Sequence, residues 1–203
     1  MEQLQFIDAF MTEVGSAAKA ISHPEIDVVI RHLYEAWERD ATIFTVGNGG
    51  SASTATHFAA DLNKYSSSKA DHRYRAHCLN DNIPLVSALT NDDGWDNVYS
   101  YQVESFMREG DVLVAISVHG GSGGDNAGEW SQNLLKAARV VKERNGKLLA
   151  LVGFDGGVLH KIAEASILVP ANSTPQVEGL HLVLTHLICA RLKQAIGDQD
   201  KRI

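Results

Sequence analysis

The segment at residues 43–61, IFTVGNGGSASTATHFAAD, constrains the fold of this chain more than any other. An apolar β-branched run enters a glycine and serine turn at 47–51, and a helix-forming stretch follows directly. A strand, turn and helix in this order place free backbone N–H groups at the positive end of a helix dipole, where a phosphate can bind. The candidate phosphate-binding residues in this turn are Asn48, Gly49, Gly50 and Ser51.

Strand and helix signals alternate along the rest of the chain. Strands are predicted at 42–46, 76–79, 112–116, 148–152 and 167–169, and helices at about 52–64, 95–107, 130–144 and 175–195, with a short helix before the last strand and two helices before the first. The strands are continuous apolar runs, which is typical of a parallel sheet covered by helices on both faces. We therefore expect an α/β fold with a five-stranded parallel sheet.

The bulk composition fits one domain. A chain of 203 residues with 44% hydrophobic residues can form one well-packed core and is short for two, so we expect a single domain over 1–203 with helices at 1–40 and the α/β core at 41–203. The net charge of −7 argues against nucleic-acid and membrane partners. Two cysteines provide no disulfide framework, and acidic residues break any early apolar run, so a cytoplasmic location is predicted.

Histidines and carboxylates gather on two of the predicted helices. His57 and Asp61 are four residues apart and share one helix face. The last helix carries Glu178, His181 and His186, and either histidine can converge with Glu178. The two histidines are about 140° apart around the helix, too far for one small site. The pattern indicates a site of imidazoles and carboxylates but leaves open which histidine belongs to it.

Other polar residues have weaker functional signals. We interpret Asn91-Asp92-Asp93-Gly94 as a turn and helix cap, from which Asn91 or Asp92 can reach a sugar hydroxyl. Gln102, on the next helix, fits a packing role or a ligand contact equally well. The glycine-rich loop at 117–126 indicates close approach to a ligand, because so many glycines cost backbone entropy. Its candidate contacts are Ser117, His119 and Ser122.

A dinucleotide fold is the main competing interpretation of the first turn. Residues 47–52 also satisfy G-x-G-x-x-A, and Asp81 follows the second strand where a ribose-binding acid can lie. Against this, polar His57 and Asp61 occupy the helix where such folds usually pack apolar residues. We expect a phosphate cradle and no nucleotide cofactor.

Taken together, these segments resemble the SIS (sugar isomerase) domain family, and within it the phosphoheptose isomerase group. The resemblance is carried by GNGGSASTATHFAADL at 47–62, NDDGWDNVYSYQVESF at 91–106, GDVLVAIS at 110–117, LLALVGFDGG at 148–157 and the helix at 178–186. It implies a three-layer α/β/α flavodoxin-like fold with two leading helices. It also implies a homotetramer, held by a central helical bundle, whose active sites are shared between subunits.

The reaction that the resemblance implies converts sedoheptulose 7-phosphate to D-glycero-D-manno-heptose 7-phosphate through an enediol, in heptose or lipopolysaccharide biosynthesis. By motif position Asp61, where the family usually has glutamate, is the catalytic base and His186 its acid partner. Members of the phosphoheptose isomerase group can carry one zinc ion per subunit, and the resemblance implies that its ligands in this chain are His57, Asp61, Glu178 and His186. Glu178 stands where the family usually has glutamine, and two imidazoles with two carboxylates suit zinc.

One loop departs from the family pattern. The second phosphate loop of the family is rich in serine and threonine, whereas this chain has Ser117-Val118-His119-Gly120-Gly121 and about nine extra residues before 131. His119 then replaces a hydroxyl contact to the phosphate, or the pocket takes a different sugar phosphate. A further alternative is a non-catalytic SIS adaptor similar to the protein that binds a bacterial replication initiator. Retention of Asp61 and His186 weighs against it.

Overall fold

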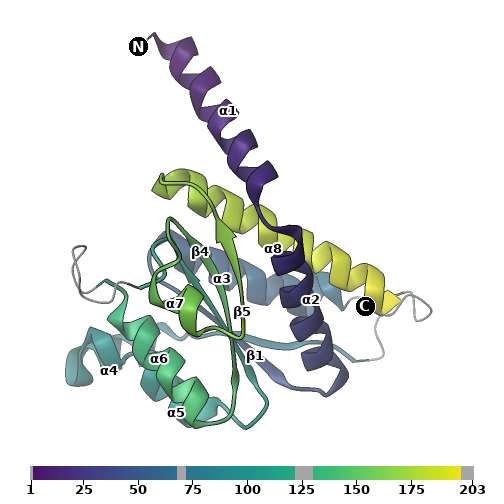
Figure 1. The fold of residues 1–203 in the computed structure, drawn as a ribbon. Helices are drawn as coiled ribbons and strands as arrows, with labels where there is room; N and C mark the ends of the chain where they lie inside the picture. Colours follow the sequence, from purple (N-terminus) through teal and green to yellow (C-terminus); the bar gives the residue numbers. More distant parts are fainter. Residues whose placement is uncertain (1, 68–71, 122–129, 198–203) are drawn as a thin grey trace.

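A five-stranded parallel sheet forms the centre of the structure (Figure 1). The computed structural model describes residues 2–67, 72–121 and 130–197. The strands are β1 (Thr42–Gly47), β2 (Arg75–Cys78), β3 (Val112–Ser117), β4 (Lys147–Gly153) and β5 (Ala165–Val169). Their spatial order, β2-β1-β3-β4-β5, is the flavodoxin-like order of doubly wound sheets. All five predicted strands are confirmed, each with ends within two residues of the predicted ones.

Helices cover both faces of the sheet, because successive strand residues point to opposite sides. Ile43 and Val112 face a core cluster that includes α2 (His23–Glu38), α3 (Gly50–Asp61) and α8 (Thr174–Gly197). Phe44 and Leu113 face a second cluster with α5 (Ser100–Phe106), α6 (Gln132–Glu143) and α7 (Gly157–Ile162). The predicted three-layer arrangement is therefore confirmed.

The two leading helices differ in how they pack. The second, α2, begins after Ser22, whose hydroxyl accepts a hydrogen bond from the Glu25 amide, and has a proline in its first turn. The first, α1 (Gln3–Ala20), extends away from the sheet (Figure 1) and buries only Ala17. None of the described helices is long and apolar enough to cross a membrane.

The structure contains one helix that the sequence did not predict, at 83–93, and the helix predicted over 95–107 is shorter than expected. The tetrapeptide at 91–94, interpreted as a turn and helix cap, ends the helix α4 (Ile83–Asp93), and Gly94 is its C-cap, with a φ of 83°. The helix α4 buries no residue fully, and its apolar pattern is short, with Val86 and Leu89 half-buried against the core. The Asn82 side chain that caps it is the signal that predicts its start. The helix expected over 95–107 is a 3-10 turn, η2 (Trp95–Asn97), followed by the separate helix α5.

The three glycine-rich turns lie at the carboxyl ends of β1, β3 and β4, as the sequence predicts. The turns after β3 and β4 are joined by hydrogen bonds from the Val158 amide to the Gly121 carbonyl (3.0 Å) and from the Leu159 amide to the Gly120 carbonyl (2.8 Å). Gly120 has a φ of +64°, and a side-chain carbon there would overlap the Gly156 carbonyl oxygen. This contact fixes the start of the loop that follows β3.

Candidate active site

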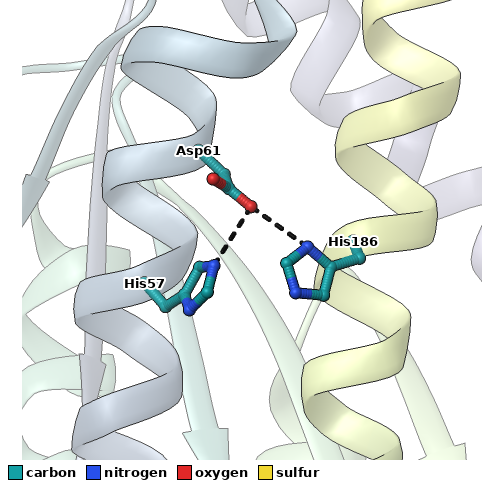
Figure 2. A group of neighbouring side chains, drawn as sticks. All are labelled: His57, Asp61 and His186. Carbon is teal, nitrogen blue, oxygen red and sulfur yellow. Dashed lines mark ion pairs between the residues drawn. The ribbon is translucent and has the colours of Figure 1, made fainter.

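Helices α3 and α8 lie side by side and bring together residues far apart in the sequence. Near the starts of the two helices, the Glu178 carboxylate lies against Gly50. Two turns further along, His186 of α8 meets His57 and Asp61 of α3 (Figure 2). The two helices therefore run in the same direction, with Glu178 against Gly50 near their N-terminal ends and a second group of side chains about 10 Å along.

One oxygen of Asp61 holds the second group together. Its Oδ2 lies 3.4 Å from His57 Nε2 and 3.2 Å from His186 Nδ1. The two imidazole rings are 4.8 Å apart and nearly perpendicular. The side chain of Asp61 is 23% exposed, whereas those of His57 and His186 are 45% and 52% exposed, so a ligand can reach both imidazoles. After Asp61, the last residue of α3, the chain continues as the π-helical turn η1 (Leu62–Ser66).

The donor atoms of this group fit a zinc ion. Within the described residues, the ligand atoms of His57, Asp61 and His186 all lie within 4.8 Å of one another. Tetrahedral zinc with bonds of about 2.0–2.1 Å separates neighbouring ligand atoms by about 3.3 Å, close to the two contacts of Asp61. Three protein ligands leave a fourth position for water or substrate, which is the arrangement of catalytic zinc sites. Glu178 lies apart from this group, two helical turns away along α8.

His181 occupies a different environment from His186. Its side chain is fully buried, and neither ring nitrogen has a hydrogen-bond partner among the described residues. Burial lowers the pKa of His181 to about 4, and the nearby backbone of Val152 offsets this only in part. The ring is therefore neutral at physiological pH. Of the two histidines left open by the sequence, the structure places His186 beside Asp61.

The glycine turn after β1 opens onto a cavity of about 170 Å³ at the carboxyl ends of β1 and β3. Its lining comprises Asn48, Ser51, Ser117, Val118, His119, Trp130, Ser131 and Glu178. Gly49 has a φ of 57° and Gly50 begins α3, so the turn directs the start of that helix towards the cavity. Its position at the carboxyl ends of parallel strands is where such folds bind ligands.

Three residues that the sequence did not single out hold this turn in place. Asn133 exchanges two side-chain hydrogen bonds with Asn48, of 2.9 and 3.0 Å. The Tyr99 hydroxyl donates to the Gly47 carbonyl at 3.2 Å and accepts from Asn80 at 2.7 Å. Burial raises the pKa of Tyr99 to about 12, so its hydroxyl stays protonated as a donor. No local pattern marks these residues, because their partners lie at least 19 positions away in the chain.

Two aromatic side chains, His119 and Trp130, line the cavity, and Phe154 from the turn after β4 packs against His119. The His119 ring centroid lies 4.5 Å from that of Trp130 and 4.2 Å from that of Phe154. The Ser117 hydroxyl accepts a hydrogen bond from the Gly120 amide at 3.1 Å and lines the same cavity. Ser122, the remaining candidate of the loop after β3, lies outside the described residues.

Three other candidates lie outside the cavity. Gln102 is buried and donates hydrogen bonds to the carbonyls of Leu79 and Val98, both at 3.1 Å, which matches its packing interpretation. Asn91 and Asp92 are exposed at the end of α4 and bond to each other. In this single chain these three side chains are not among those lining the 170 Å³ cavity.

Comparison with known proteins establishes the family. A family model described as "SIS domain" matches residues 5–153. The chain belongs to the SIS domain family. This SIS domain chain is 32% identical over 190 residues to the phosphoheptose isomerase of Citrifermentans bemidjiense, with 93% of each chain covered. A solved structure of the phosphoheptose isomerase GmhA from Neisseria gonorrhoeae superposes with a TM-score of 0.82 at 28% identity, over 94% of this chain and 98% of that one.

A second relative of the SIS domain chain carries a different name. It is 45% identical over 161 residues, or 77% of this chain, to the lincomycin biosynthesis protein LmbN of Streptomyces lincolnensis. The chain spans 58% of the length of that relative. Membership in the phosphoheptose isomerase group, expected from the sequence motifs, is confirmed by the relatives that cover nearly the whole chain.

Proposed function

We propose that this protein is an aldose–ketose isomerase of a phosphorylated sugar, and that the sugar is sedoheptulose 7-phosphate, converted to D-glycero-D-manno-heptose 7-phosphate. The observation that carries the proposal is the contact of one Asp61 oxygen with both His57 and His186, on the helix that begins at the anion cradle. His57 is seven residues from Gly50, about 10 Å along α3. A phosphorylated sugar chain can bridge this span, whereas phosphate alone cannot.

The residues have complementary roles in such a reaction. The N-terminal turn of α3 and the Ser51 hydroxyl hold the phosphate, and the remaining sugar extends along α3 and α8 towards Asp61. Aldose–ketose interconversion through an enediol requires a base that removes a carbon-bound proton and a second group that moves a hydroxyl proton. Asp61 is assigned the first role and His186 the second.

Zinc is proposed as the resident metal, held by His57, Asp61 and His186. A bound zinc ion would supply Lewis-acid polarisation of the sugar carbonyl. Glu178 is retained as a candidate fourth ligand from the resemblance, although its carboxylate lies at Gly50 in this structure. Elemental analysis of protein purified without chelators tests the assignment: the wild type and His181→Leu are expected to contain zinc, and His57→Ala to lack it. Zinc lost from His181→Leu and kept by His57→Ala would contradict it.

The assembly and location are proposed on separate grounds. We infer a single SIS domain that forms a homotetramer with shared active sites, because α1 leaves the apolar side chains of Leu4, Ile7 and Met11 exposed. The proposed cytoplasmic location rests on two buried free cysteines, Cys78 and Cys189, which suit a reducing compartment. The proposed function involves no nucleic acid, no membrane and no nucleotide cofactor.

The decisive experiment is a direct assay of the purified protein with sedoheptulose 7-phosphate, with and without added zinc, followed by separation of ketose and aldose phosphates. Formation of heptose 7-phosphate supports the proposal. Absence of any aldose product under both conditions would exclude this substrate. If every sugar phosphate tested is also returned unchanged, the non-catalytic adaptor becomes the better interpretation.

A second candidate is an isomerase acting on a different sugar phosphate. It is favoured by the aromatic side chains of His119 and Trp130, which line the cavity beside the cradle. The greater identity to the lincomycin biosynthesis protein, 45% against 32%, points the same way. Comparing kcat/KM over phosphorylated ketoses of six to eight carbons separates the two candidates, because a sugar preferred over sedoheptulose 7-phosphate by tenfold or more would establish the second.

A further inference from the structure

The anion cradle of this structure already contains an anionic side chain. Both oxygens of the Glu178 carboxylate lie so close to Gly50 that a side-chain carbon at that glycine would overlap them. Gly50 is the first residue of α3 and belongs to the turn assigned to phosphate binding. Glu178 also lines the same 170 Å³ cavity as Asn48, Ser51 and Ser117. The carboxylate therefore lies where the phosphate of a substrate is expected.

The negative charge of Glu178 at this position affects the binding of phosphate. The positive end of the α3 dipole favours a negative group, whether that group is a carboxylate or a phosphate. Among the described residues that line the cavity, Glu178 is the only acidic one, and none is lysine or arginine. A phosphate entering this cavity therefore meets an unfavourable negative charge that no lysine or arginine in the lining offsets.

We propose that Glu178 is a built-in competitor for the phosphate site, whose carboxylate occupies the cradle in the free protein and leaves Gly50 when a phosphorylated ligand binds. This inference rests on the proposed function, since it takes the cradle as the phosphate site. Binding then exchanges one anion for another at the same helix N-terminus. Glu178 thereby sets the affinity of the cradle for phosphorylated ligands and is a specificity-determining residue of the site.

The test is calorimetric titration of the full-length protein with inorganic phosphate. Glu178→Gln keeps the length of the side chain and removes its charge, so we expect phosphate to bind at least tenfold more tightly than to the wild type. Glu143→Gln, at the exposed end of α6, makes the same charge change away from the cradle and is expected to leave the affinity within twofold. Equal or weaker phosphate binding by Glu178→Gln would overturn the inference.

Two further variants assign the binding to the cradle. Ser51→Ala is expected to weaken phosphate binding in both the wild-type and Glu178→Gln backgrounds, because Ser51 lines the cavity and the substitution removes a hydrogen-bonding hydroxyl. Repeating the Glu178→Gln comparison in a His57→Ala background removes any contribution of a metal, and the tightening is expected to persist. Its disappearance there would show that Glu178 acts through the metal site and would overturn the competitor role.

The same titrations separate this inference from the proposed function. If the wild type binds phosphate and Glu178→Gln binds it no better, the competitor role fails while the phosphate cradle stands. If neither protein binds phosphate, the cradle itself is wrong, and both the assignment of the phosphate site and the role of Glu178 are overturned. Binding by Glu178→Gln alone supports the competitor role most strongly.

Discussion

Asp61 is the residue on which the candidate chemistry depends most. Its Oδ2 oxygen contacts an imidazole from its own helix and another from α8, so a single carboxylate joins the two halves of the site. Aspartate is one methylene shorter than the glutamate usual in the family, and small differences in the position of a reacting group have large effects on rate. Its contribution can therefore be measured by changing either its charge or its length.

Asp61→Asn removes the charge and keeps the shape of the side chain. We expect kcat for isomerisation to fall by about 10²- to 10⁴-fold, the usual contribution of a general base, with a smaller change in KM. Steady-state kinetics on the preferred sugar phosphate measure this. Asp27→Asn, on an exposed face of α2, is the matched control and is expected to keep full activity. Activity of Asp61→Asn within threefold of the wild type would exclude Asp61 as the base.

His181 is predicted to make the protein sensitive to acid. Its pKa is about 4 in the folded protein against 6.5 for an unperturbed histidine, so between these values the unfolded chain binds a proton that the folded chain does not. The free energy of unfolding therefore decreases as the pH falls from 6.5 towards 4. This residue accounts for about 2 kcal/mol of the loss between pH 7 and pH 4.5.

Replacing His181 with leucine tests this contribution. Leucine has a similar volume and no titratable group, so urea unfolding of His181→Leu at a fixed protein concentration is expected to show a loss smaller by about 2 kcal/mol over the same pH interval. At pH 7 the variant is expected to be at least as stable as the wild type, because a buried polar group without a partner is removed. Identical pH profiles for both proteins would contradict the prediction.

At the scale of elements, the strands were predicted better than the connections between them. A buried parallel strand is marked by its own continuous apolar run, and all five such runs form strands. The helix α4 buries none of its residues fully, and its half-buried apolar side chains, which include Val86 and Leu89, leave only a short periodic pattern in the sequence. The contact between the turns after β3 and β4 leaves no local pattern, since it joins backbone groups more than 30 residues apart.

Gly120→Ala probes this contact between turns. The substitution places a side chain at a φ of +64° and against the Gly156 carbonyl, so we expect a loss of at least about 2 kcal/mol in the free energy of unfolding and a melting temperature lower by about 4–8 °C. Differential scanning calorimetry measures both. Gly179→Ala, in open space within α8, is the control and is expected to be stabilising by up to about 1 kcal/mol. Equal melting temperatures for the two variants would show that the turns are not in contact.

At the scale of the whole molecule, contacts within one chain do not explain the exposed apolar side chains of α1. It extends away from the sheet (Figure 1), and its side chains of Leu4, Ile7 and Met11 are 74%, 45% and 64% exposed. These three residues follow helical spacing and form one apolar stripe. An exposed apolar stripe on a projecting helix is typical of a surface covered by another subunit.

Ile7→Lys combined with Met11→Lys is expected to convert the proposed tetramer into smaller species, because charges in this stripe would oppose helix packing between subunits. Light scattering coupled to gel filtration measures the mass. The control combines Gln5→Lys and Ala9→Lys, which add the same charge about a quarter turn or more away from the stripe. The proposal that α1 packs in a helical bundle between subunits would be contradicted if Ile7→Lys with Met11→Lys remained tetrameric. It would also be contradicted if the wild-type protein were monomeric at micromolar concentration.

The sequence by itself determined the α/β class, the five strands, the glycine turn that begins α3 and the pairing of His57 with Asp61 on one helix face. Each of these depends on residues within a few positions of one another, so local spacing is sufficient. The tertiary structure decided that His186 meets Asp61 while His181 is buried, and that Glu178 lies at Gly50. Spacing along α8 gives the angle between these side chains, but only the packing of α8 against α3 and the sheet decides which of them face the site.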